Sequence, residues 1–110
     1  MNTEGGSIMK RSRTYIASPP GATISEQLQD SGMSQKEFAA RIGMPEKQIS
    51  RLLSGDVPLT PDMASKLEKT LGVPAVFWNR LESIYRTKLA MVERENAMEA
   101  AKQFAKKIPL

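Results

Sequence analysis

Residues 34–54 decide the fold, and they read SQKEFAARIGMPEKQISRLLS. Ser34 is followed three residues later by Glu37, which is the capping-box pattern that begins a helix. Gly43 suits the left-handed position that ends a helix, and Pro45 is tolerated in the first turn of the next one. The stretch therefore predicts two short helices joined by a tight turn.

Two short helices around a glycine-containing turn have the geometry of a helix-turn-helix. The first helix is expected to bury Phe38, Ala39 and Ile42. The small side chain of Ala39 lets the second helix cross it closely, and Ile49 with Leu52 or Leu53 anchors that helix in the core. The residues left facing outward from the second helix are Glu46, Lys47, Gln48, Ser50 and Arg51. These residue types suit base edges, since Arg and Lys bind guanine, Gln binds adenine and Glu accepts from cytosine.

The remainder of the chain from residue 23 onward also follows a helical pattern, without the alternation typical of strands. The predicted helices cover residues 23–31, 34–43, 45–54, 60–72 and 74–108. The sequence therefore predicts an all-α fold, with a five-helix domain and an extended C-terminal helix. We expect three parts, namely a flexible basic arm over 1–22, the helix-turn-helix domain over 23–86 and a C-terminal helical extension over 87–110.

The first 22 residues are polar and rich in Gly, Ser and Pro. Pro19 and Pro20 oppose a helix there, and few apolar side chains are available to order the segment. One interpretation is a solvated tail. The other is a basic arm that follows DNA phosphates or docks a partner, because the segment carries Lys10, Arg11 and Arg13.

Composition narrows the possible functions of this 110-residue chain, which has room for one domain. It contains neither cysteine nor histidine, which excludes disulfides, thiolate chemistry and the usual general base. We therefore expect no enzyme, metal or cofactor. The formal net charge of +4 suits an anionic partner such as nucleic acid. No apolar stretch approaches the roughly 20 residues that span a bilayer, so a cytoplasmic protein is expected.

The stretch SQKEFAARIG at residues 34–43 resembles the first helix of the helix-turn-helix in the lambda-repressor/Cro (XRE) superfamily. Three further stretches are similar to the HigA/VapI-type antitoxins of that superfamily. They are Pro20-Gly21, LLSG at 52–55 with LTPDMA at 59–64, and LGVPAVFW at 71–78. The resemblance covers residues 20–86 and implies a lambda-repressor-like fold.

The resemblance implies a dimeric repressor that binds an operator at its own promoter and also binds a cognate toxin. Gln35 corresponds to a phosphate-contacting glutamine of the family, and the Ser54-Gly55 turn is placed to offer amides to a phosphate. Pro45 departs from the family, where a Ser or Thr is common. Glu46 is unusual beside phosphates and has the alternative role of orienting Lys47 or Arg51. The complete set of expected DNA-binding residues is Ser34, Gln35, Lys36, Glu46, Lys47, Gln48, Ser50, Arg51 and Ser54.

The C-terminal part, residues 80–109, looks similar to longer XRE-type regulators encoded beside ImmA/IrrE-type metallopeptidases. The helical spacing places Phe77, Leu81, Ile84 and Tyr85 in the core, with Trp78 covering the domain or a dimer interface. Met91, Met98 and Phe104 are expected to form either a solvated face or a partner-binding surface. Two alternatives to an autoregulating antitoxin stay open. One is a module that mainly sequesters a RelE-like toxin or a metallopeptidase, and the other is a phage-type regulator without a toxin.

Overall fold

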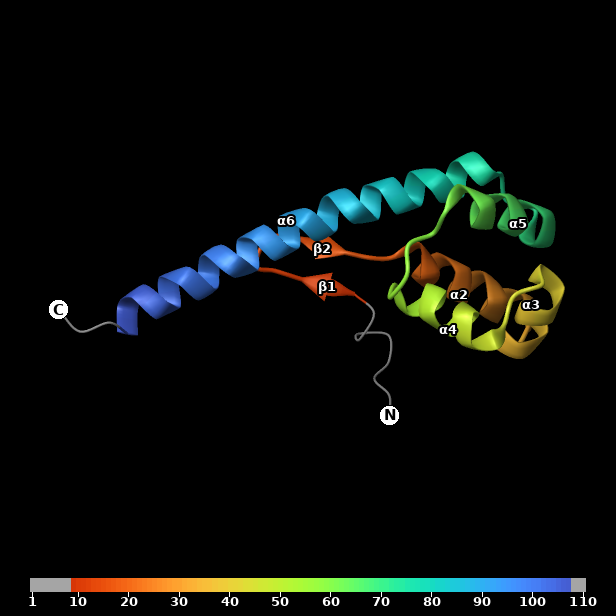
Figure 1. The fold of residues 1–110 in the computed structure, drawn as a ribbon, viewed down its shortest axis with the longest axis horizontal. Coiled ribbons are helices and arrows are strands. Elements are labelled where there is room, and N and C mark those ends of the chain that lie inside the picture. The colour runs from red at the N-terminus through yellow and green to blue at the C-terminus, as the bar shows by residue number, and fades with distance from the viewer. Residues whose placement is uncertain (1–8, 108–110) are drawn as a thin grey trace.

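The structure, a computed structural model, describes residues 9–107. Two short strands precede five helices in this part of the chain (Figure 1). The elements are β1 (Lys10–Arg11), β2 (Ile16–Ala17), α2 (Pro20–Ser31), α3 (Gln35–Ile42), α4 (Glu46–Ser54), α5 (Pro61–Leu71) and α6 (Ala75–Lys107). Helices α2 to α5 and the start of α6 form a helical head, and the rest of α6 extends from it, so the molecule measures 61 × 32 × 22 Å. The predicted all-α fold is confirmed.

Side-chain caps set where the helices begin, as the sequence predicts. The Ser34 hydroxyl accepts a hydrogen bond from the Glu37 amide at 3.0 Å, and the Thr60 hydroxyl accepts one from the Met63 amide at 3.2 Å. Each bond satisfies an amide that has no partner within its own helix. Gly43 follows α3 with a φ of 77°, a left-handed conformation that glycine adopts without steric cost.

Helix α2 begins at Pro20, so the predicted start at residue 23 is wrong. Proline is compatible with the first turn of a helix because the amide it lacks would have no partner there. Gly21 explains why this turn is buried. A Cβ on Gly21 would overlap the Leu53 backbone, so the glycine lets α2 and α4 approach at backbone distance.

The main core lies between the five helices and includes Trp78, which is fully buried. Its indole Nε1 donates to the Val73 carbonyl at 3.2 Å, so the polar atom is satisfied inside the core. Phe77 is 39% exposed and Ile84 is 51% exposed, so the prediction that both are core residues is wrong. The face of α6 that is buried is therefore one position, or about 100° around the helix, away from the predicted face. The larger indole of Trp78 fills the core in place of the Phe77 ring.

Residues 9–19 are ordered, which corrects the expectation of an unstructured segment for this part of the arm; residues 1–8 lie outside the described residues. β1 and β2 pair antiparallel, with Lys10 opposite Ala17 and Arg11 opposite Ile16. We call residues 10–17 the N-terminal hairpin. Ala17 is fully buried in a second, smaller core with Tyr85 and Val92 of α6.

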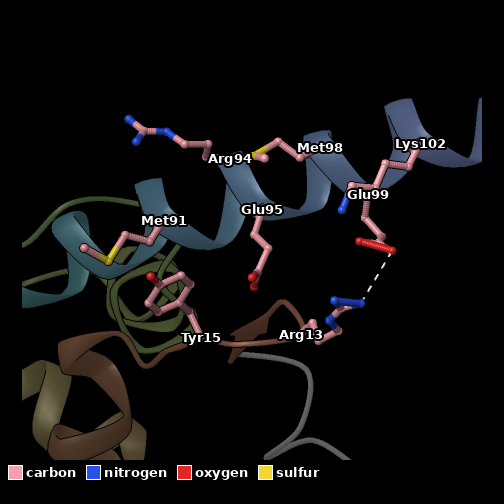
Figure 2. A pocket seen from close by; sticks show the side chains of 8 residues that line it. All are labelled: Arg13, Tyr15, Met91, Arg94, Glu95, Met98, Glu99 and Lys102. Carbon is pink, nitrogen blue, oxygen red and sulfur yellow. Dashed lines mark ion pairs between the residues drawn. The ribbon is translucent and has the colours of Figure 1, made fainter.

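Glu95 fastens this hairpin to α6. Its carboxylate accepts hydrogen bonds from the Ser12 hydroxyl at 2.5 Å, the Thr14 amide at 2.7 Å and the Thr14 hydroxyl at 2.6 Å. Figure 2 shows Glu95 pointing from α6 to the hairpin, between Tyr15 and Arg13. The partners are more than 80 positions apart in the sequence, which is why local patterns did not reveal the hairpin.

Candidate nucleic-acid interface

Helix α4 presents one apolar face and one polar face. Ile49 and Leu52 are buried in the main core. The opposite face carries the five side chains predicted to meet base edges, and all five are exposed: Glu46, Lys47, Gln48, Ser50 and Arg51. The structure therefore brings these predicted residues together on one solvent-facing surface, as a recognition helix requires.

The turn between α3 and α4 sets the angle at which this surface is presented. The Gly43 and Met44 amides both donate to the Ala39 carbonyl, at 3.0 and 3.1 Å. Ala39 and Met44 are both buried, as predicted for Ala39. Pro45 precedes α4 in an extended conformation and provides no side-chain cap, so its ring takes the place of the Ser or Thr expected in relatives.

The predicted phosphate contacts lie at the ends of α3 and α4. Lys36 is exposed in the first turn of α3, while Gln35 is half-buried beside it. The Ser34 hydroxyl is used as the helix cap. The Ser54 hydroxyl donates to the Arg51 carbonyl at 3.1 Å at the end of α4.

The cations of α4 keep their charge available to a ligand. Within residues 9–107, no acidic side chain forms an ion pair with Lys47 or Arg51. Within the same range, Glu46 forms no ion pair with Lys47 or Arg51. The alternative role, in which Glu46 orients these two cations, therefore has no contact to support it. Lys47 and Arg51, together with Pro45, Gln48 and Val57, line a shallow hollow beside the helix.

Lys10 and Arg11 of β1 were considered only as part of a basic arm and not among the individual DNA-binding residues, because the N-terminal hairpin that positions them was not predicted. The basic composition of residues 10–13 was the one available signal. Among the described residues, no group of acidic side chains is arranged to hold a metal ion. None of the helices in the same range combines the length and the apolar character needed to cross a membrane.

The fold and this exposed helix define the class of protein. The sequence model of the Helix-turn-helix family matches residues 24–78, which run from α2 into the start of α6. The chain belongs to this family and is a DNA-binding helix-turn-helix regulator of the XRE type.

Relatives extend the similarity beyond the family segment. The chain is 31% identical over 83 residues to an uncharacterised HTH-type transcriptional regulator, YddM, from Escherichia coli K12, covering 76% of this chain and 84% of the relative. It resembles the solved structure of an addiction module antidote protein of the HigA family from Coxiella burnetii, with 26% identity and a TM-score of 0.62 over 83% of this chain and 94% of that one. Its fold is also similar to that of the Pseudomonas aeruginosa antitoxin HigA, whose structure was solved with the higBA promoter. The identity is 22% and the TM-score 0.62, over 83% of this chain and 94% of that one. The resemblance to HigA-type antitoxins is thus confirmed, while the roles of the individual site residues stay predictions.

Proposed function

We propose that this protein is a sequence-specific transcriptional repressor that binds a double-stranded operator at its own promoter as a homodimer. The observation that carries the proposal is the face of α4, where exposed Lys47, Gln48 and Arg51 lie opposite the buried Ile49 and Leu52. The fold shared with a HigA antitoxin solved with its promoter supports this function. Such a protein needs no catalysis or cofactor, and it acts in the cytoplasm with the DNA.

In this mechanism, α4 of each subunit lies in one of two successive major grooves, about 34–36 Å apart. Lys47, Gln48 and Arg51 contact base edges and supply specificity. Gln35 and Lys36 bind backbone phosphates, which set the register of the protein on the duplex without reading sequence. Ser34, Glu46, Ser50 and Ser54 complete the proposed contact surface.

A row of exposed apolar side chains on α6 supports the homodimer. We call it the α6 apolar row, and it consists of Phe77, Ile84, Met91 and Met98, each seven residues after the last. A seven-residue repeat keeps side chains on one side of a helix and suits packing against a second helix. Exposed apolar side chains in such a row favour association because burial removes them from water.

Binding to DNA from upstream of the gene tests the proposal, by fluorescence anisotropy at two salt concentrations against scrambled competitor. We expect tight binding that resists the competitor and is lost in the Lys47→Ala/Arg51→Ala variant. Lys69→Ala/Arg80→Ala is the matched control, because it removes the same two charges from α5 and the first turns of α6. Binding that is strongly salt-dependent and equal on all sequences would refute a sequence-specific repressor.

A second function, neutralisation of a protein partner, is favoured by the exposed Val76 at 64% and Phe104 at 68%, which extend the apolar surface at both ends of α6. The relative named an addiction module antidote supports this choice. The partner would be a RelE-like ribonuclease toxin or an ImmA/IrrE-type metallopeptidase. Co-expression with a neighbouring gene of either type should yield a complex that Phe104→Glu disrupts, and failure of both to co-purify would argue against this function.

A further inference from the structure

Pro45 lies directly before the recognition helix, which holds its ring in a fixed place. The residue has a φ of −60° and a ψ of 143°, and its carbonyl accepts a hydrogen bond from the Ile49 amide at 3.0 Å. The preceding Met44 is buried, whereas Pro45 is exposed. Pro45 therefore presents a rigid apolar surface to solvent, with no side-chain hydrogen-bonding group, at the start of α4.

Val57 provides a second apolar side chain to the shallow hollow beside α4. The Asp56 amide donates to the Arg51 carbonyl at 2.9 Å, so the chain turns back toward α4 as soon as the helix ends. Val57 is half-buried and packs against the main core, which fixes its position. The hollow is lined by two apolar and three polar side chains, namely Pro45, Val57, Lys47, Gln48 and Arg51.

This combination of side chains matches the edge of an A·T base pair in the major groove. Thymine presents a methyl group there, and adenine presents an acceptor and a donor that a glutamine amide binds together. Pro45 and Gln48 border the same hollow, so an apolar surface and an amide lie side by side. The first residues of a recognition helix are the ones that contact base edges. A methyl group in the hollow would leave water against Pro45 and Val57, beside the amide of Gln48.

We propose that Pro45 and Val57 are specificity-determining residues that bind the methyl group of one thymine in each operator half-site. The methyl group contacts both apolar side chains and lies beside the polar groups of Gln48 and Arg51. Such a contact selects thymine because burial removes its methyl group from water, whereas uracil has no methyl group to bury. The contact rests on the proposed function, because it requires α4 in the major groove.

Replacement of thymidine by deoxyuridine in the operator tests the contact, because this exchange removes only the methyl group of the base. Each thymidine of the operator is replaced in turn, and the affinity is measured by fluorescence anisotropy. One position in each half-site should bind about fourfold more weakly, which corresponds to one buried carbon group. The Pro45→Ser variant should bind the thymidine and deoxyuridine operators equally. Serine is a favourable residue directly before a helix, so this variant should fold.

Pro74→Ser is the matched control, because Pro74 is also an exposed proline directly before a helix, α6. This control should keep the preference for thymidine over deoxyuridine. Val57→Thr replaces one methyl group of the hollow by a hydroxyl and should lower the preference. Equal binding of all deoxyuridine operators by the unaltered protein would overturn the proposed methyl contact. A preference that either Pro45→Ser or Val57→Thr keeps in full would also overturn it.

The same measurements separate this contact from the function on which it rests. If the unaltered protein does not prefer the operator to scrambled DNA, the proposed function fails. If the protein has that preference while no thymine methyl group contributes to it, the methyl contact alone fails.

Discussion

Tyr85, one third of the way along α6, packs against Gly55, the residue that ends the recognition helix. A Cβ on Gly55 would be 3.4 Å from the Tyr85 hydroxyl, and Gly55 has a φ of 85°. Burial raises the pKa of Tyr85, so its hydroxyl is neutral at physiological pH. Because Tyr85 also packs on Ala17 of the N-terminal hairpin, one side chain connects the hairpin, α6 and the end of α4.

This contact predicts that Gly55→Ala destabilises the protein more than Gly43→Ala does. Both positions are left-handed, and an L side chain there costs about 1–2 kcal/mol. At Gly43 a Cβ would enter open space, whereas at Gly55 it would crowd the Pro19 ring and contact the Tyr85 hydroxyl. Urea unfolding of both variants measures the difference. Equal losses would show that the contact at Gly55 relaxes without cost.

The phase of α6 predicts opposite outcomes for two adjacent aromatic residues. Trp78→Ala removes a fully buried indole and should lower the free energy of unfolding by about 3–5 kcal/mol. Phe77→Ala should have a much smaller effect, because the ring is 39% exposed. Chemical denaturation of the two variants checks this order. A larger loss for Phe77→Ala would contradict the observed helix phase.

Glu95 predicts an acid-sensitive hairpin. Hydrogen bonds from Ser12 and Thr14 lower the pKa of the Glu95 carboxyl. The carboxylate therefore stabilises the folded hairpin at pH values above its unfolded pKa, and this stabilisation is lost as pH falls through the lowered folded pKa. The protection of the Thr14 amide against hydrogen exchange, measured relative to the intrinsic exchange rate at the same pH, should therefore fall at acid pH. In the Glu95→Gln variant, the Thr14 amide should lose protection at neutral pH as well. If this amide stays equally protected in the variant, Glu95 does not hold the hairpin in place.

Base and phosphate contacts predict different patterns of lost affinity on a set of mutated operators. Arg51→Ala should cost about 1–3 kcal/mol and relax selectivity at one base position. Lys36→Ala should weaken binding about equally on every operator, since it removes a proposed phosphate contact. Competition binding across single-base operator variants separates the two patterns. Uniform weakening by Arg51→Ala would reassign Arg51 to a phosphate.

The α6 apolar row predicts that a charge at its exposed end prevents self-association. Met98→Glu should convert the dimer to a monomer and reduce operator affinity, because a charge buried between helices carries a large desolvation cost. Ala100→Glu adds the same single charge at an exposed position on the other side of α6, about 200° around the helix from Met98, so it is the control and should stay dimeric. Light scattering gives the mass of each variant. A dimeric Met98→Glu protein would place the dimer interface elsewhere.

The helix-turn-helix could be predicted from the sequence because its determinants are close together along the chain. Ser34 caps α3 by accepting from the Glu37 amide, Gly43 ends the helix, and the 3.6-residue period separates Ile49 from the exposed Lys47 and Arg51. These signals act within a few residues, so they need no knowledge of distant partners. The exposed face of α4 follows directly from them.

Sequence patterns alone therefore account for the helical class, the helix boundaries with side-chain caps and the composition of the recognition surface. The start of α2, the phase of α6 and the N-terminal hairpin depend on long-range packing. Gly21 meets Leu53 only when α2 and α4 are assembled, and Trp78 displaces Phe77 because the assembled core has room for the indole. The hairpin forms because Glu95 and Val92 satisfy and cover two strands that are too short to be stable alone. Contacts between residues far apart in the chain carry no local pattern, so only the assembled structure reveals them.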